Sequence, residues 1–587
     1  MKPAPRIFLG SLAAAIAVLS LRAVTAPAAD DVVLRAMQDE LARTTAQLKL
    51  ENSAPPYFAA YRVTDANESR VSATFGSIVS TQPVRHRQRM LAVEVRVGTP
   101  QLDQTNFVSM AGLMGGLGMQ SPLPIDDNYT ELRRQLWLAS DSAYKQAVEQ
   151  LAKKKASLEN KTRADDSGDF SSATPTQTTE ETAPLAVDLK AAESLVRELS
   201  GVFREFPAVT NSTAAIDMDE HYTRYVNSEG TRYTRRETMV FLVVMAVTQA
   251  PDGRPSENVG VHFARTMEGL PAKAQLLAEV RSLGQQLTAV REAPLLEDTY
   301  NGPVLFENEA AAEVFAQAFA SRLVAAKRAV IENPQIEAAL AQFDNPFMDK
   351  LGARVLPESF TVVDDATRSE FAGAPLFGAN KVDDEGVPTR EVKLVEAGRL
   401  KTLLTSRVPS RGLLESSGSR HGGGPAPSNL IVTSSDGLTP EAMKAELLKL
   451  VQERGKPYGV IVRRVARPQF HLQRDQPSMP NRDTGRIEPA VLAYKVFPDG
   501  HEELLRNVEV SGVTASAFKD ILAAGNQPVV YHTPFVIFRP GTMPSSELAS
   551  LAVPSLLLDD VTLKAPSGAT PKPPVAKHPY FDKESAR

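Results

Sequence analysis

The chain contains no cysteine among its 587 residues, and this absence removes several kinds of chemistry at once. Without a thiol there is no disulfide, no lipid-anchored cysteine, no thiol nucleophile and no cysteine ligand for a metal. Stability must therefore come from the packed cores. Hydrophobic residues make up 42% of the chain, which at this length is enough apolar material for two or more domains.

Blocks of positive charge are also missing. No long run of Lys or Arg occurs, and the formal net charge is −5, so nucleic acid is not expected as a direct partner. There is no P-loop and no Gly-x-Ser-x-Gly elbow. A Gly-Gly-Leu-Gly sequence lies within residues 109–120, but no strand and helix flank it, and it predicts a flexible surface segment rather than a nucleotide loop.

One apolar run stands out, at the N terminus, and it has the pattern of a secretory signal. Lys2 and Arg6 precede the apolar residues 7–21, and Ala26-Pro27-Ala28 supplies small residues for cleavage. We interpret residues 1–28 as a signal peptide and expect an exported protein, periplasmic or extracellular, with no stable membrane anchor after cleavage. An uncleaved signal anchor is the alternative.

Residues 30–295 predict an N-terminal domain that mixes helices with antiparallel strands. Apolar residues at helical spacing favour helices, and runs of β-branched and aromatic residues favour strands. The predicted helices are 31–50, 132–155, 187–199 and 270–291, and the predicted strands are 57–63, 70–79, 90–97 and two within 220–249 around a turn at 227–230. The Lys153-Lys154-Lys155 run indicates a solvated last helical turn rather than a binding patch.

The insertion 163–184 is acidic, rich in Ser and Thr, and poor in large apolar residues. Such a composition buries too little apolar surface to offset the entropy of ordering, so we predict a disordered segment or long loop there. The Pro- and Lys-rich residues 565–587 are predicted to be a tail without structure for the same reason.

Residues 300–564 predict a β-rich C-terminal domain with a few crossing helices, and the fold class is therefore α+β with two domains. Gly302 opens an apolar strand that leads into an Ala-rich helix ending near Leu323. Thr439 and Pro440 begin another helix, and Asp499-Gly500 predicts a hairpin turn. The other predicted elements are a strand at 359–364, a hairpin at 390–405, strands at 491–497 and 503–510, a short helix at 514–524 and a closing strand at 555–563.

Several short segments, taken in order, resemble the TldD/PmbA (modulator of gyrase) metallopeptidase family. The signature is most recognisable in residues 382–389, Val-Asp-Asp-Glu-Gly-Val-Pro-Thr, followed by Val-Glu-Ala-Gly-Arg-Leu at 395–400. The Pro-Ser-Asn-Leu element at 427–430 and the strand at 554–561 also resemble family segments. The resemblance covers most of the second half and part of the first.

Catalytic members of that family carry His-Glu-x-x-x-His on a helix that the Ala-rich helix of this chain resembles. The first His falls on Ala316, the Glu on Gln317 and the second His on Ser321. Alanine cannot bind a metal, glutamine cannot act as a general base, and serine is a poor zinc ligand. The cysteine that the catalytic branch uses as third ligand is absent too. The chain is therefore closer to the PmbA/TldE-type branch, which lacks the motif.

The resemblance implies a non-catalytic partner subunit that helps a zinc-bearing TldD-type subunit bind and cleave unfolded peptides. It implies a dimer with a TldD-type homologous subunit or with itself, zinc in the partner, no cofactor in this chain, and an isolated chain that is inactive. One alternative is a metallopeptidase with an atypical metal site built from scattered His and Asp residues. Another is a stand-alone envelope protein that binds peptides.

Three residues are candidates for binding a peptide. Arg420 and His421 lie in a Gly-rich loop at 419–425, and Asn429 belongs to the Ser-Asn-Leu element. An arginine in such a loop can hold a carboxylate or a backbone carbonyl by charge-assisted hydrogen bonds, although a mobile loop without a ligand is the competing interpretation. The acidic cluster at 383–385 is explained by turn formation and solvation.

Overall fold

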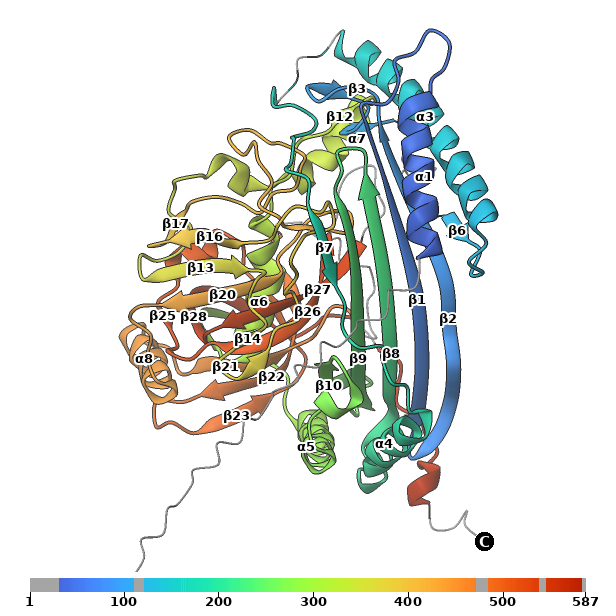
Figure 1. The fold of residues 1–587 in the computed structure, drawn as a ribbon. Coiled ribbons are helices and arrows are strands. Elements are labelled where there is room, and N and C mark those ends of the chain that lie inside the picture. The colour runs from blue at the N-terminus through green and yellow to red at the C-terminus, as the bar shows by residue number, and fades with distance from the viewer. Residues whose placement is uncertain are drawn as a thin grey trace, which may run out of the picture.

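The computed structural model describes residues 31–109, 121–159, 161, 163, 165–470, 484–537, 545–568 and 570–582. The predicted signal peptide, most of the predicted loop at 109–120 and the last residues of the tail lie outside the described residues. The chain forms a long curved sheet in its first half and a compact β-rich unit in its second half (Figure 1). The prediction of an α+β fold is confirmed.

Two long hairpins form the centre of the first sheet. Strands β1 (Phe58–Thr74) and β2 (Ser77–Arg96) form one hairpin, β8 (Val209–Asn227) and β9 (Arg232–Gln249) form the other, and β1 pairs with β8. Strand β10 (Pro255–Ala264) lies at the far side in the order β10-β9-β8-β1-β2-β6. The predicted strand at 70–79 is wrong, because Phe75 and Gly76 have positive φ and form the turn between β1 and β2.

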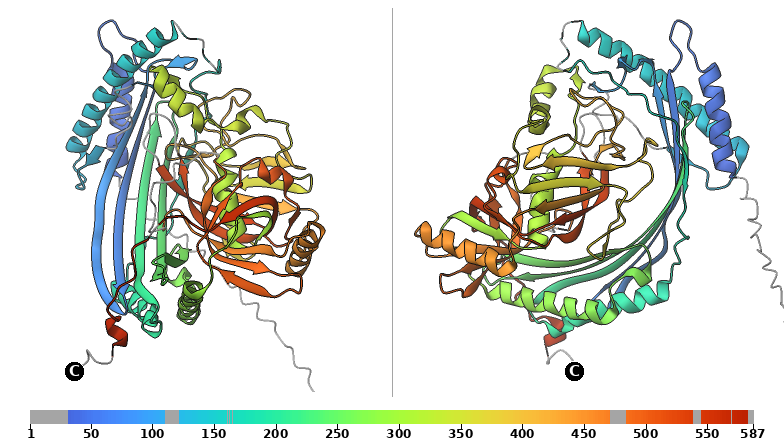
Figure 2. Two further views of the ribbon diagram at one scale, coloured as in Figure 1. Left: turned by 180° about the vertical axis from the view of Figure 1, so that it is seen from behind. Right: turned by 60° about the vertical axis from the view of Figure 1, so that its left-hand side comes forward.

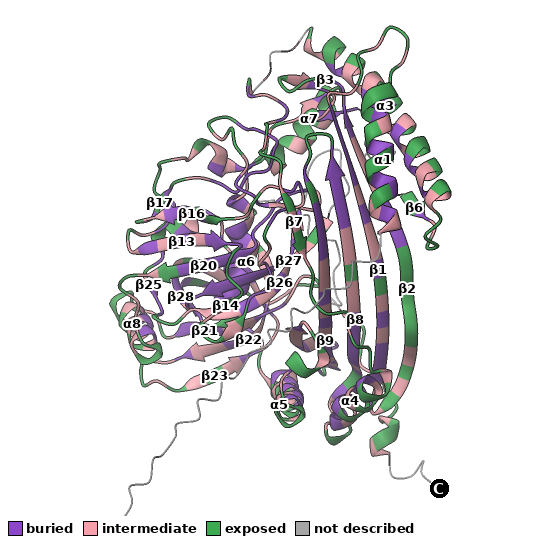
Figure 3. Cartoon of the chain, in the orientation of Figure 1, coloured by how far each residue is buried: buried purple, intermediate pink, exposed green. Residues whose placement is uncertain are grey.

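Helices cover one face of this sheet and leave the other face to the second half of the chain (Figures 2 and 3). Asp31 and Asn128 cap the first two helices by accepting a hydrogen bond from the backbone N–H three residues later. The helices that cover this face are α1 (Val32–Gln47), α3 (Tyr129–Leu158), α4 (Leu189–Gly201) and α5 (Lys273–Glu292). The four predicted helices are thus confirmed. No helix in the described residues is long and apolar enough to cross a membrane.

The second half contains a closed barrel and a six-stranded sheet. The barrel closes because β11 bonds to β21 on one side and to β28 on the other. Its strands are β11 (Tyr300–Phe306), β21 (Gly459–Val465), β22 (Ile487–Val496), β24 (Val508–Ser511) and β28 (Leu556–Lys564), with β23 (Glu502–Leu505) beside β22. The second sheet has the order β17-β16-β13-β20-β27-β26. Its longer strands are β13 (Phe360–Asp365), β16 (Glu391–Glu396), β20 (Asn429–Ser434), β26 (Val529–Ile537) and β27 (Ser545–Val553).

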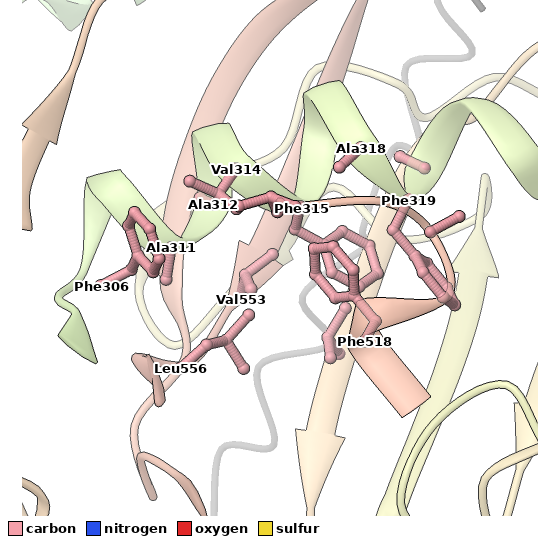
Figure 4. Packing of buried hydrophobic residues seen from close by; sticks show 14 of the residues in the cluster. Phe306, Ala311, Ala312, Val314, Phe315, Ala318, Phe319, Phe518, Val553 and Leu556 are labelled. Carbon is pink, nitrogen blue, oxygen red and sulfur yellow. The ribbon is translucent and has the colours of Figure 1, made fainter. Parts of the chain in front are cut away.

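Helix α6 (Glu309–Ala318) lies between the barrel and the second sheet and fills the main core. Its run of small residues lets strands approach closely, and its Phe315 packs on Phe319 with ring centroids 5.0 Å apart. The ring of Phe518 packs against that of Phe319 and completes this aromatic group (Figure 4). The α-helix ends at Ala318, and the 3₁₀ turn Ala320–Arg322 follows.

Shorter elements complete the described chain. Helix α7 spans Pro334–Leu340, and the later helix α8 (Pro440–Glu453) is capped by Thr439 as predicted. The short strands are β3 (Gly98–Thr99), β4 (Leu102–Asp103), β5 (Phe107–Val108), β6 (Ser121–Leu123), β7 (Gln177–Glu180), β12 (Val330–Ile331), β14 (Glu370–Phe371), β15 (Ala374–Pro375), β17 (Arg399–Leu400), β18 (Arg420–His421), β19 (Gly424–Pro425) and β25 (Ala523–Ala524). The predicted helix at 514–524 is only a 3₁₀ turn, Ala517–Asp520, followed by β25.

The insertion 163–184 does not follow the prediction of disorder. The carboxylate of Asp169 is fully buried and pairs with Lys154, Arg163 and Lys327 at 2.7, 3.0 and 3.3 Å. The ring of Phe170 is buried next to it, and β7 adds a parallel edge to β9. Composition misled the prediction because a few buried anchors order the segment. Lys154 is likewise fully buried rather than solvated.

The tail beyond β28 also departs from the prediction, since its described residues lie against the first half. Gln249 donates to the carbonyl of Pro571 at 2.8 Å. A Cβ at Gly253, whose φ is 93°, would stand 2.2 Å from that same carbonyl oxygen, so only glycine fits there. Further along, the ring of Tyr580 stacks on Phe75 with centroids 5.4 Å apart.

We predict that Asp169→Ala lowers the free energy of unfolding by about 3–5 kcal/mol, because it leaves the buried Lys154 and Lys327 without their shared anion. Chemical denaturation followed by circular dichroism measures the change. The matched control is Asp166→Ala, an exposed acidic residue of the same segment, which should alter stability little. Equal stability of the two variants would contradict a buried role for Asp169.

Candidate functional site

Ala316, Gln317 and Ser321, which the resemblance places at the family's zinc-motif positions, lie on α6 and just beyond it, and Gln317 is the most constrained of them. Its Nε2 donates to Glu313 Oε1 at 2.7 Å and to the carbonyl oxygen of Ala466 at 3.4 Å. Its Oε1 accepts from the backbone N–H of Glu488 at 2.9 Å. The carboxamide thus joins α6 to the barrel, at the end of β21 through its Nε2 and at the start of β22 through its Oε1.

Glu313, one turn earlier on α6, carries the network further inward. It is 2% exposed and accepts a hydrogen bond from the hydroxyl of Tyr531. Burial raises the pKa of Glu313 above its usual value, against the lowering effect of its hydrogen bonds with Tyr531 and Gln317. The guanidinium of Arg467 lies 4.3 Å from the centre of the Tyr531 ring. The arrangement ties a carboxyl, a phenol and an amide together in one network.

The other two motif positions supply no metal ligand. Ala316 packs against the main core. The Oγ atom of Ser321 is buried and has no hydrogen-bond partner within the described ranges. Across those ranges, no three side chains of His, Asp or Glu converge in a way that could hold a metal ion. The donor set at Ala316, Gln317 and Ser321 therefore does not fit zinc.

A small cavity of about 20 Å³ lies beside this network, at the junction of the two halves. Val259 of β10 lines it from the first half, and Glu309 of α6 and Arg464 of β21 line it from the second. The ring of Phe470, also in its wall, stacks on Phe241 of β9 with centroids 5.6 Å apart. The cavity has room for about one water molecule and combines apolar walls with charged groups of both signs.

Arg420 and His421, predicted to bind peptide, lie on the β18–β19 hairpin and are partly buried. Arg420 donates from Nη1 to Glu385 and from Nε to the carbonyl of Gly422, both at 3.1 Å. His421 Nε2 lies 2.8 Å from Ser428 Oγ, and burial lowers the pKa of its imidazole. The structure brings these two residues together and engages both with the protein's own groups.

Asn429 directly follows Ser428, the hydrogen-bond partner of His421, at the start of β20 and is fully buried. Its side chain donates to the carbonyls of Asp365 and Arg368 at 3.0 and 2.8 Å and accepts from the N–H of Gly378 at 3.0 Å. Because every polar atom of the amide is used, Asn429 fixes the junction of three loops. A ligand would have to displace that junction to reach it.

A charged cluster that no local sequence pattern indicates lies between the halves. Asp384 faces Arg62 and Arg235 of the long sheet, at 3.4 and 3.3 Å, and accepts from the N–H of Gly422 at 2.8 Å. Although burial opposes its charge, the two guanidinium groups hold the pKa of Asp384 well below its usual range. Glu547 also lies against Gly422, and burial, with the charge of Asp384, raises the pKa of Glu547 to about 8.

This cluster corrects the expectation that residues 383–385 form a solvated turn. Asp383 is fully buried and Glu385 is 6% exposed, and Asp383 accepts from the N–H groups of Glu385 and Val387 at 2.9 Å. The turn is real, but the opposite half of the molecule covers it. Nothing in the local sequence indicates Arg62 and Arg235, since they lie 322 and 149 residues away from Asp384.

Two family descriptions match most of the chain from residue 182 onward. The PmbA/TldA metallopeptidase central domain matches residues 182–283, and the PmbA/TldA metallopeptidase C-terminal domain matches residues 299–565. Together they cover well over half of the sequence. This chain belongs to the PmbA/TldD metallopeptidase family.

Curated relatives and solved structures agree with that assignment. A metalloprotease from Methanocaldococcus jannaschii is 52% identical over 66 residues, 11% of this chain and 14% of that protein. A metalloprotease from Methanothermobacter thermautotrophicus is 28% identical over 213 residues, 36% of this chain and 42% of that protein. The chain thus aligns with less than half the length of either relative.

The fold matches two solved structures over nearly their whole length. A candidate modulator of DNA gyrase from Thermotoga maritima has a TM-score of 0.57 at 16% identity, covering 89% of this chain and 99% of that one. TldE from Thermococcus kodakarensis has a TM-score of 0.55 at 13% identity, covering 90% and 100%. At such identities the likeness establishes the fold of this PmbA/TldD family member.

The stability of the folded chain should depend on pH through Asp364. Its carboxylate accepts hydrogen bonds from the backbone N–H groups of Ser428 and Asn429, both at 2.9 Å. Burial raises its pKa from 3.8 to about 7 in the folded chain, so the folded state binds a proton more tightly than the unfolded state. Folding therefore loses stability through this group as pH rises from about 4 to about 7. Asp364→Asn keeps an acceptor oxygen and does not titrate.

We expect Asp364→Asn to be more stable than the unmodified chain at pH 7.5, by up to about 4 kcal/mol for a shift of this size. The difference should shrink to nothing near pH 4. Thermal unfolding across this pH range measures it, with the exposed Asp166→Asn as control for loss of one negative charge. A gain that is constant across pH would contradict the assignment.

Proposed function

We propose that this PmbA/TldD family protein is a non-catalytic partner subunit that helps a zinc-bearing TldD-type subunit bind and cleave unfolded peptides. The observation that carries the proposal is Gln317, which stands where the family's catalytic glutamate belongs and engages its amide with Glu313, Ala466 and Glu488. A glutamine cannot take a proton from water as a general base.

The chemistry of the neighbouring positions supports the same proposal. Ala316 offers no donor atom, and the serine at 321 lies beyond the end of α6 rather than one turn along it. The chain has no cysteine to complete a ligand set. Zinc chemistry in the complex would then have to come from the partner subunit, and this chain would contribute shape and binding surface.

Peptide binding and export are parts of the proposal that rest on separate features. Peptide binding rests on the family resemblance, since the cavity beside α6 holds about one water molecule and is too small to take a peptide. The N-terminal pattern at 1–28 supports export to the periplasm or beyond.

The first test is elemental analysis of the purified chain, alone and with a TldD-type subunit that carries the intact motif. We expect no stoichiometric zinc and no hydrolysis of unfolded peptide by the chain alone, and both in the mixture, where the two proteins should co-elute. The partner alone serves as the control for the added activity. One tightly held zinc with hydrolysis by the isolated chain would instead favour a metallopeptidase with an atypical site.

A second prediction concerns the variant Ala316→His, Gln317→Glu, Ser321→His, which restores the residue types of the motif. We expect little peptidase activity, because the third ligand is missing and because the new carboxylate at position 317 would meet the buried carboxyl of Glu313. That pair should cost about 1–3 kcal/mol of stability above neutral pH and less in acid, where one carboxyl holds a proton.

Gln317→Met serves as the matched control for the triple variant, since it removes the amide without adding charge. Its loss of stability should show no comparable pH dependence. Strong peptidase activity of the triple variant would show that the rest of a metal site is intact, and it would overturn the non-catalytic assignment.

A further inference from the structure

A second cavity, of about 50 Å³, lies at the other end of the interface between the halves and is lined by an excess of positive charge. Five of its lining residues are Lys or Arg and three are Asp or Glu. The cations are Lys154, Lys161, Arg163, Lys327 and Arg328.

The negative groups in this cavity are already occupied. Asp169 alone is shared by Lys154, Arg163 and Lys327. Asp165 accepts from the backbone N–H groups of Ser167 and Arg411 at 2.9 and 3.0 Å, so its carboxylate is engaged by peptide groups rather than by a cation.

The two innermost lysines are almost inaccessible, with side chains 0% and 3% exposed at Lys154 and Lys327. Burial lowers the pKa of both, and the attraction of Asp169 does not fully offset it. Lys154 also donates to the carbonyl of Thr105 at 2.6 Å and Lys327 to that of Ser167 at 2.7 Å, so both ammonium groups are already bonded within the protein. Because three cations share the one carboxylate of Asp169, the group still leaves positive charge that favours an incoming anion.

Two cations at the outer rim of the cavity are placed where they can contact such an anion. Lys161 pairs with Glu337 at 2.8 Å, and Arg328 pairs with Asp344 while remaining 58% exposed. Lys161 also donates to the carbonyl of Ile331 at 2.8 Å and is 30% exposed, so a ligand would have to replace that bond as well. Because ion pairs at the rim are weak and exchange readily in water, both cations can still turn toward a ligand. The volume admits several water molecules and therefore a group of a few heavy atoms.

We propose that this cavity binds a small oxyanion, either a tetrahedral phosphate-like group or a carboxylate. Lys161 and Arg328 would contact it at the rim, and the buried pair Lys154 and Lys327 would supply the field that holds it there. The lining residues of 106–169 precede the part of the chain that the family descriptions match. The remaining lining residues, within 327–337, belong to the matched C-terminal domain, and the cavity shares no lining residue with the cavity beside α6.

Thermal unfolding of the full chain with inorganic phosphate tests the site, against sodium chloride at the same ionic strength because salt alone screens the lysines. We expect a saturable rise in melting temperature of about 2 °C or more once phosphate exceeds its dissociation constant. A parallel series with acetate tells a tetrahedral ligand from a planar carboxylate. No rise above chloride with either anion would overturn the proposal.

Variants of the rim residues test whether the stabilisation by phosphate arises at this cavity. Lys161→Gln with Arg328→Gln changes only rim residues, and the folded chain should retain its circular dichroism spectrum while its apparent affinity for phosphate falls about tenfold or more. The control is Lys153→Gln, which neighbours Lys154 on α3, pairs with Glu149 and does not line the cavity. A phosphate response that survives in the rim variant unchanged would also overturn the proposal.

Discussion

The ordering of the segment around Asp169 and Phe170 is the constraint on which the relation of the two halves depends. The Phe170 ring lies between two guanidinium groups, with Arg96 of β2 3.8 Å and Arg407 of the second half 3.9 Å from its centre. Both arginines are nearly fully buried. Two like charges could not be buried so close without the ring and the carboxylates between them.

The anions that balance the two arginines come from different parts of the chain. Arg407 forms a two-point ion pair with Glu229, in the turn between β8 and β9, at 2.6 and 2.8 Å, and Arg96 pairs with Asp103 at 2.9 Å. Removing Glu229 would leave the buried Arg407 without its carboxylate, whereas Arg96 would keep Glu94 at 2.6 Å if Asp103 were lost.

Local patterns were sufficient to predict the regular elements but not the anchors. The helix over 132–155, the capped helix after Thr439 and the closing strand were all foreseeable, because periodicity and capping act within a few residues. Residues 163–184 were misjudged since composition averages over a segment, whereas one buried Asp and one Phe decide its order. The turn at Phe75 carried no Asn-Gly or Asp-Gly signal.

In the candidate site, too, residue types could be predicted from the sequence, but their long-range partners could not. Positions 316, 317 and 321 could be assigned from the resemblance, and their lack of ligands follows from residue type alone. The partners of Gln317 could not be predicted, because Ala466 and Glu488 are brought to it by the barrel. Arg420 was foreseen as a contact residue, yet its neighbours Asp383 and Glu385 became visible only once the loops had packed.

The contacts between the two halves of the chain limit how far the halves can move relative to each other. Domains joined by a polar interface usually shift against each other. Here the buried ion pairs at Asp169 and at Asp384 hold the halves together, and the tail binds back to the long sheet by stacking Tyr580 on Phe75. Because these attachments are separated along the interface, a rotation about any one of them would break the others. The chain is thus built to hold the surfaces of its two halves in one fixed geometry, and any ligand or partner would meet a preformed face.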